Sequence, residues 1–333
     1  MRIYFGTNRN PDDPAIPTSF GDGFSPNGLT DLRFGWAEIN DQDHKKYRLT
    51  VAAEKLTGAK GKQVLGSQAV FEAVRKEMTT RRQPCVIFVH GFNVSFRDAI
   101  ARAAALKVAY SGLPMTLFLF TWPSDGSMMP FKAYISDRDD ARASGVALGR
   151  GLQKLSHYLK DITADQHCGQ QVHFIAHSMG NYALRWALQS IKGSAGSNIR
   201  RHFEQILLFA ADEDDDAFEL DHKLLTLPDM ARRVTVYHNP GDKALVVSDT
   251  TKANPDRLGA GGPRNSRALP DKVSVVNCEP VLSFTQDPTG HQYYTVNPVV
   301  RQDVMGVLKG IEPAALKTRK YQSETRSYRL KRP

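Results

Sequence analysis

The stretch "QVHFIAHSMGNYALRWAL", residues 171–188, has the pattern of a buried strand, a sharp turn and a helix. Its apolar run ends at A-H-S-M-G, and helical spacing follows at once. A serine at this corner is either the N-cap of the helix or a nucleophile held clear of its own backbone. Ala176 and Gly180, two before and two after Ser178, are small, as a close approach of strand and helix requires. The corner therefore makes Ser178 a candidate nucleophile.

Two backbone amides are candidate donors to an oxyanion formed at Ser178. The turn directs the N–H of Met179 and the N-terminus of the helix toward the serine. An earlier buried strand ends in "VHGFN", residues 89–93, where Gly91 lets the backbone approach a substrate carbonyl. We expect the N–H of Phe92 to be the second donor; the alternative is a simple glycine turn.

Strand and helix patterns alternate along the whole chain. Such units need crossover connections, so they predict a mainly parallel sheet with helices on both faces. We expect the first two strands to be antiparallel at one edge. The predicted strands cover 2–9, 45–54, 84–92, 115–124, 171–178, 205–212, 232–239 and 272–280, and the predicted helices cover 67–78, 95–110 (with Ser95 as N-cap), 139–162, 181–191 and 298–311.

A serine nucleophile in this architecture needs an acid and then a histidine, in that chain order. His291 lies in "PTGHQYY", a loop between the last strand and the last helix, and is the candidate base. The acid has two candidate positions, each just past a strand. Asp242 lies in "YHNPGDKAL", whereas Asp212 and Asp214 lie in "FAADEDDDAF". We favour Asp242 and keep the other two as alternatives.

Four further residues are candidates for lining a substrate pocket. Gly91 and His177 flank the candidate donors and the nucleophile in the chain, and Trp122 and Tyr134 follow the strand that ends in "FTWPS". For Trp122, packing in the core is an equal alternative.

The sequence predicts neither a cofactor nor a metal. The acidic run 212–216 has no histidine and no regular ligand spacing, so a solvated turn that caps a helix is the better interpretation. No flavin or nicotinamide fingerprint is present. The three cysteines are widely spread and form no CxxC pair, which fits a reducing cytoplasm. The first residues have no secretory h-region, and no apolar run is long enough to span a membrane.

Positive charge is concentrated at the C-terminus. The segment 317–333 carries seven Lys or Arg and one Glu, so +6 of the formal net charge of +9 lies in these 17 residues. We expect a basic, flexible tail over 314–333, after a single domain over 1–313 that contains a polar loop at about 246–270. Such a tail could contact an acidic partner or a membrane surface electrostatically. No nucleic-acid-binding module is evident.

Six motifs resemble those of a bacterial α/β-hydrolase family of unknown function in the esterase and lipase superfamily. They occur in the order "HGFN", "FTWPS", "AHSMGN", "AADEDDDAF", "GDKAL" and "GHQYYTVNP", and the N-terminal "IYFGTNR" and "LRFGWAEI" resemble the first strands of that family. The resemblance covers most of the chain but not the basic tail.

The resemblance implies an α/β-hydrolase fold, with a doubly wound parallel sheet and antiparallel N-terminal edge strands. It implies Ser178 as nucleophile, Asp242 as acid and His291 as base, acting on a small-molecule or lipid ester. Two alternatives stay open: the same triad could serve a thioesterase or acyltransferase, or the fold could be retained in a binding protein without activity.

Overall fold

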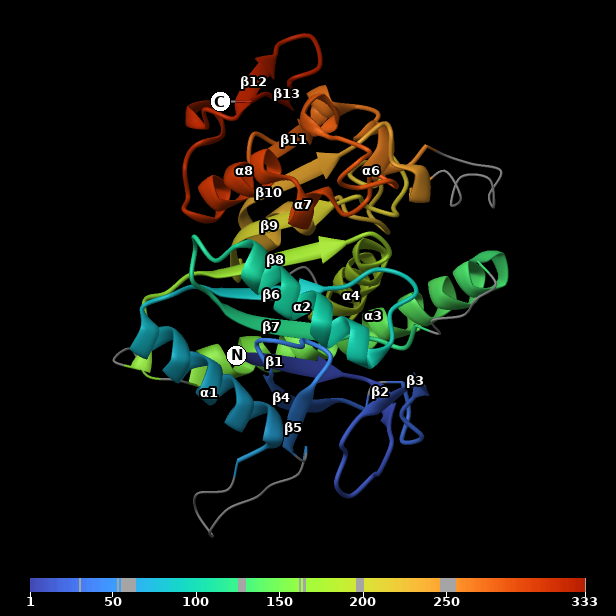
Figure 1. Ribbon diagram of the computed structural model, residues 1–333, viewed down its shortest axis with the longest axis vertical. Coiled ribbons are helices and arrows are strands. Elements are labelled where there is room, and N and C mark those ends of the chain that lie inside the picture. The colour runs from blue at the N-terminus through green and yellow to red at the C-terminus, as the bar shows by residue number, and fades with distance from the viewer. Residues whose placement is uncertain are drawn as a thin grey trace.

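The computed structural model describes residues 1–29, 31–52, 54, 64–124, 130–161, 163, 166–195, 201–245 and 256–332, with only the backbone for 130–133 and 195. One large twisted sheet runs through these residues (Figure 1). Its strands are β1 (Arg2–Thr7), β4 (Arg33–Ile39), β5 (Tyr47–Ala52), β6 (Cys85–Val89), β7 (Thr116–Thr121), β8 (Val172–His177), β9 (Phe203–Phe209), β10 (Ala231–His238), β11 (Val273–Asn277), β12 (Arg319–Gln322) and β13 (Ser327–Leu330).

The strand order is β12-β13-β11-β10-β9-β8-β6-β7-β1-β4-β5. Neighbours from β13 to β1 are parallel, whereas β4 and β5 at one edge and β12 at the other are antiparallel. The predicted parallel sheet with antiparallel N-terminal edge strands is confirmed. The first two predicted strands are not paired with each other, however, because β4 lies between β1 and β5. A separate hairpin joins β2 (Arg9–Pro11) to β3 (Phe20–Phe24).

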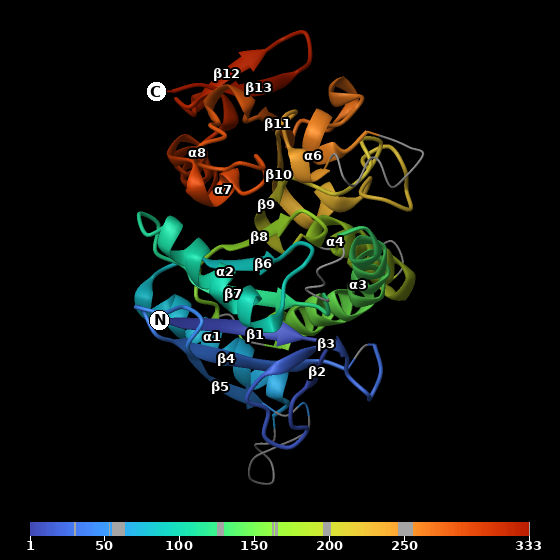
Figure 2. The same ribbon diagram turned by 45° about the vertical axis from the view of Figure 1, so that its right-hand side comes forward.

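Helices cover both faces of the sheet (Figure 2). They are α1 (Gly66–Arg81), α2 (Phe96–Ala109), α3 (Pro130–Asp161), α4 (Gly180–Ala195), α6 (Leu258–Gly261), α7 (Tyr293–Val296) and α8 (Pro298–Leu308). Helices α1, α3 and α4 share one hydrophobic core with the sheet, and α2, α7 and α8 share the other. Strand β6 shows why its apolar run is continuous: Ile87 and Val89 face the first core, and Val86 and Phe88 face the second.

Helix ends follow the sequence in one case and depart from it in another. Ser95 is the N-cap of α2, as predicted, and its hydroxyl accepts a hydrogen bond from the Asp98 amide at 3.2 Å. Helix α3 begins at Pro130, earlier than the predicted helix over 139–162. Of the predicted loop at 246–270, residues 246–255 lie outside the described residues. The rest contains α6 and a short 3-10 turn over Ser266–Ala268.

The expectation of a flexible C-terminal tail is wrong. Residues after 313 form the hairpin β12–β13, and β13 joins the main sheet beside β11. The anchor is Arg319, which is buried and donates to both carboxylate oxygens of Asp303 on α8, the shortest bond measuring 2.7 Å. Asp303 also accepts from Tyr237 and Thr318. A buried ion pair with this many hydrogen bonds fixes the hairpin against the fold.

Contact between the remaining cations of this hairpin and an acidic partner stays a prediction. Among the helices described, none combines the length and the apolar composition needed to cross a membrane.

Replacement of Arg319 by Ala should lower the free energy of unfolding by about 3 to 5 kcal/mol, because Asp303 would keep a buried charge without its partner. Urea unfolding followed by circular dichroism measures this change. The matched control is Arg329→Ala in β13, since Arg329 is exposed and its loss should change stability by less than about 0.5 kcal/mol. Equal unfolding midpoints for the two variants would contradict the anchoring role.

Candidate active site

Ser178 sits at a strained turn directly after β8. Its φ of 53° lies in the left-handed region, which a residue other than glycine rarely adopts. Gly180 is required because a Cβ there would lie 2.6 Å from the His90 carbonyl oxygen and 2.7 Å from that of Val89. Gly91 is required because its Cβ would lie 2.7 Å from the Ser178 Cβ. The turn therefore has the geometry of a nucleophile elbow and packs against the loop after β6; below it is called the elbow.

Hydrogen bonds to the backbone hold this elbow in place. The Ser178 amide donates to the Phe209 carbonyl at 3.0 Å, and the Asp212 amide donates to the Ser178 carbonyl at 3.2 Å. The Asn181 side chain donates to the carbonyl oxygens of both Ser178 and Phe209. Asn181 was not a predicted site residue, although the N in "AHSMGN" is part of the motif. It links the elbow to the neighbouring strand β9.

His291 and Asp242 are brought together from two loops. The Nδ1 atom of His291 lies 2.7 Å from Oδ2 of Asp242, which is fully buried. Because a carboxylate only accepts, Nδ1 carries the proton, and Nε2 of the neutral ring is then free to accept one. The other oxygen of Asp242 accepts from the amides of Ala244 and Leu245. Asp242, rather than Asp212 or Asp214, is therefore the partner of His291.

Two residues that we did not predict hold these loops in place. Asn239 donates to the Gly290 carbonyl at 2.7 Å and accepts from the Gly241 amide, so it spans the loops that carry Asp242 and His291. Asp287 accepts from the amides of Gly290 and Gln292, on either side of the histidine. These contacts fix the orientation of the histidine through its backbone.

Ser178 and His291 are both little exposed, and no hydrogen bond joins their side chains. Both are nearly buried, with exposed fractions of 7% for Ser178 and 9% for His291. Among the described residues, the Ser178 hydroxyl has no hydrogen-bond partner. Such contacts commonly tighten only when substrate is bound.

The amides of Phe92 and Met179 are both available as donors. Neither has an acceptor among the described residues, although each belongs to a loop that is otherwise well bonded. By contrast, the two amides that follow Phe92 in the chain, those of Asn93 and Val94, donate to Asp137 and Ser124. Unpaired amides next to a nucleophile are the donors that an oxyanion hole requires.

Hydrogen bonds that run through the side chains of His90, Thr121 and Arg9 set the direction of the Phe92 amide. The carbonyl of Gly91 accepts from Nδ1 of His90 at 2.8 Å, so that ring is protonated on Nδ1. Nε2 of His90 then accepts from the Thr121 hydroxyl, which itself accepts from buried Arg9. In a trans peptide the N–H points opposite to the C=O, so holding the Gly91 carbonyl toward His90 turns the Phe92 N–H away from it.

The four candidate pocket residues occupy different places. Gly91 contacts Ser178 directly. Trp122 is fully buried and stacks on His90 at 5.3 Å, so it packs beneath the oxyanion loop rather than lining a pocket. Tyr134 lies in α3, where its hydroxyl donates to Asp212 and its ring contacts Phe92.

His177 is buried behind His291. Its Nε2 donates to the backbone carbonyl of His291 at 3.1 Å, and the two rings lie 4.6 Å apart. Burial, together with the neighbouring His291, holds the pKa of His177 well below its usual range. His177 therefore supports His291 from behind as a neutral ring.

The acidic run 212–216 is not the solvated helix cap that we expected. Asp212 and Glu213 are buried, and four of the five carboxylates of the run are paired with cations from four other segments. These ion pairs are Asp212 with Arg138 and Arg257, Glu213 with Arg185, Asp214 with Arg257 and Lys223, and Asp216 with Lys223 and Arg264. Among the described residues, no group of three or more His, Cys, Asp and Glu side chains could hold a metal ion.

A family model matches most of the chain. Residues 67–307 match the model of a family described as alpha/beta hydrolase of unknown function (DUF900). The chain belongs to this family. No curated protein matches it.

Two solved structures are similar at low identity. Lipase B of Aspergillus fumigatus is 11% identical, with a TM-score of 0.40, covering 72% of this chain and 56% of the lipase. An esterase of Pyrobaculum calidifontis is also 11% identical, with a TM-score of 0.34, covering 92% of this chain and 87% of the esterase. This chain thus spans little more than half of the lipase, and we draw no argument from either similarity.

Glu213, beside the elbow, should make stability depend on pH. Burial raises its pKa from 4.5 to about 7, and among the described residues its Oε1 has no hydrogen-bond partner. Between pH 4.5 and 7 the folded chain therefore keeps a proton that the unfolded chain loses, so stability falls as pH rises.

The Glu213→Gln variant lacks this titration. Relative to it, the wild-type protein should lose on the order of 2 to 3 kcal/mol of unfolding free energy between pH 4.5 and pH 8. Urea unfolding of both proteins across this range measures the difference, in which contributions common to both cancel. If the unfolding free energies of the two proteins changed in parallel with pH, the prediction of a raised Glu213 pKa would be wrong.

Proposed function

We propose that the protein is a serine hydrolase that cleaves carboxylic esters through an acyl-enzyme intermediate. The observation that carries this proposal is the 2.7 Å contact between His291 and Asp242, on the same edge of the sheet as a strained Ser178. Two unpaired amides, those of Phe92 and Met179, accompany the serine. Nucleophile, base, orienting acid and oxyanion donors are the parts that acyl transfer needs.

Each residue has one role in the proposed reaction. Nε2 of His291 takes the proton of Ser178 as its oxygen attacks the ester carbonyl carbon, and Asp242 stabilises the resulting imidazolium. The Phe92 and Met179 amides donate to the oxyanion of the tetrahedral intermediate. The intermediate collapses when the C–O bond to the alcohol breaks and His291 returns the proton to the leaving oxygen. Water, activated by the same histidine, then releases the acid and restores Ser178.

The proposed substrate is a small-molecule or lipid ester, and we propose a cytoplasmic location. The three cysteines support the location because all are free thiols, and two of them, Cys85 and Cys278, are buried.

Ser178→Ala should abolish turnover of p-nitrophenyl esters and labelling by a fluorophosphonate, because Ser178 is the residue that accepts the acyl or phosphonyl group in the proposed reaction. Asp242→Asn should lower kcat by about 10²- to 10⁴-fold while leaving Ser178 in place, since the amide no longer favours the Nδ1–H form of His291. Steady-state kinetics over esters of graded chain length measure both effects. Wild-type protein without serine-dependent turnover or labelling would refute the proposal.

Gly91→Ala tests the contact between the elbow and the oxyanion loop. Its Cβ would lie 2.7 Å from the Ser178 Cβ and 3.2 Å from its Oγ, so the two loops must separate. Displacement of one oxyanion donor should reduce kcat by about 10²-fold or more. Gly193→Ala in α4 is the control, because nothing lies within 4 Å of a Cβ at that position. Unchanged kcat in Gly91→Ala would contradict the geometry.

A further inference from the structure

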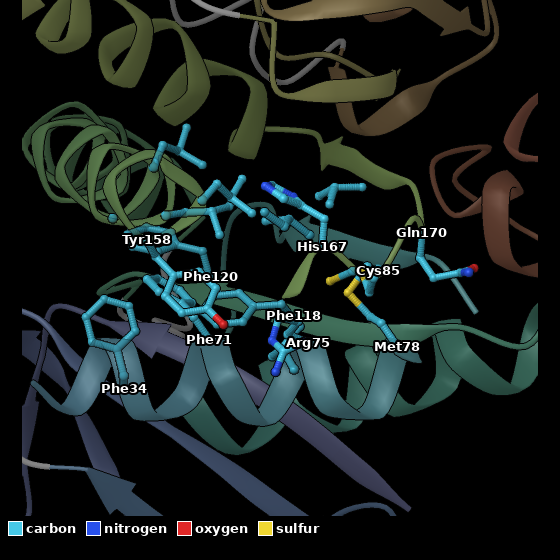
Figure 3. A pocket seen from close by; sticks show the side chains of 18 of the residues that line it. Phe34, Phe71, Arg75, Met78, Cys85, Phe118, Phe120, Tyr158, His167 and Gln170 are labelled. Atoms are coloured by element: carbon cyan, nitrogen blue, oxygen red, sulfur yellow. The ribbon is translucent and has the colours of Figure 1, made fainter. Parts of the chain in front are cut away.

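An apolar space that Ser178 does not line lies on the face of the sheet covered by α1 and α3. It is a cavity of about 220 Å³ between α1, α3 and the sheet (Figure 3). Cys85 and Val172, which line it, stand at the amino ends of β6 and β8. Ser178 follows the carboxyl end of β8. The cavity is therefore separate from the candidate active site, and nothing in the proposed reaction uses it.

The cavity walls are suited to hydrocarbon. Figure 3 shows the rings of Phe71, Phe118, Phe120 and Tyr158 gathered at one side, with Met78 and Cys85 toward the other. All of these except Tyr158 are buried.

The polar groups in the wall already bind one another. Arg75 donates two hydrogen bonds to Glu72, at 2.6 and 2.7 Å, and a third to the Gln166 carbonyl. The Tyr158 hydroxyl donates to Glu72 at 2.6 Å. A ligand inside the cavity thus meets carbon and sulfur, while His167 and Gly169 are exposed at one end. This exposed end is the mouth of the cavity.

A glycine in α3 keeps the cavity open. A Cβ at Gly151 would meet only the Cδ1 of Leu32, at 3.9 Å. The other glycines in this part of α3 are needed for packing: a Cβ at Gly145 would lie 2.3 Å from the Trp186 Cβ, and one at Gly149 would lie 3.0 Å from the Ala187 carbonyl oxygen. Gly151 has no such requirement and carries the ordinary helix penalty of glycine. Any larger side chain there would fill the space.

We propose that this cavity binds a single aliphatic chain of about eight carbons that carries a polar head, such as a medium-chain alcohol. An apolar cavity of about 150 Å³ stays dry and holds benzene, so one of this volume accommodates a somewhat larger hydrocarbon. The chain occupies the apolar interior, and its head remains at the mouth beside His167 and Gln170, where water is available. An alcohol has no ester group, so its binding in this cavity can be measured separately from the proposed hydrolysis at Ser178.

The experiment uses the full-length protein with ¹³C-methyl methionine and 1-octanol as the probe. Met78 lines the cavity, and Met179 follows the nucleophile, so each methyl signal reports on one site. The Met78 signal should shift saturably with one equivalent bound, while the Met179 signal stays in place. Ser178→Ala should behave as the wild type does. No saturable shift at Met78, or a shift at Met179 instead, overturns the proposal.

Variants at Gly151 test the occupant's size. Gly151→Leu should weaken octanol binding at least 10-fold, whereas the same substitution at exposed Gly193 in α4 should leave it unchanged. Gly151→Ala adds one carbon without a clash, so it should fold normally and shift the preferred alcohol to a shorter chain in the series from hexanol to decanol. Undiminished octanol binding in Gly151→Leu, or an unchanged preference in Gly151→Ala, contradicts the assignment.

Discussion

The close approach of the elbow to the loop after β6 is the constraint on which the site depends. Gly180 presses against the carbonyls of Val89 and His90, and Gly91 presses against Ser178. These contacts exist because β8 and β6 are neighbours and parallel, so their carboxyl ends meet at one edge. The same contact that accompanies the φ of 53° at Ser178 places the loop of Gly91 and Phe92 beside it. The strained backbone of Ser178 and the position of the Phe92 amide thus both follow from the parallel pairing of β6 with β8.

The frame behind His291 extends farther than the site itself. Tyr293, two residues along the chain, donates its hydroxyl to the Tyr237 carbonyl and accepts from the Ala210 amide. The hydroxyl of Tyr237 in turn donates to Asp303, the partner of Arg319. The C-terminal hairpin is therefore connected to the loop that carries His291 through buried side chains. Basic residues at a chain end can be structural when one of them, here Arg319, finds a buried carboxylate.

The sequence predicts what is local and misses what depends on distant partners. Ser178, Asp242 and His291 could be proposed because each follows a strand with a clear apolar pattern. Arg9 and Thr121 support the oxyanion loop across 112 residues of sequence, and no local pattern marks such a pair. The hairpin at the C-terminus was missed because its strands are only four residues long and their basic side chains interrupt any apolar pattern, which resembles a solvated tail. The acidic run was misjudged because its cations come from separate segments.

The packing of α3 explains why an apolar cavity lies between α1, α3 and the sheet, whereas loops fill the carboxyl edge. Gly145 and Gly149 bring α3 into backbone contact with α4, the helix that leaves the elbow. Close contact on that side sets the distance of α3 from α1, and the large rings between them do not fill the remaining space. The carboxyl edge, by contrast, is filled by loops whose polar groups bond to one another. Because α3 is held tightly against α4, an apolar cavity remains between α3 and α1. Gly151 of α3 lines this cavity, and any larger residue at that position would reduce its volume.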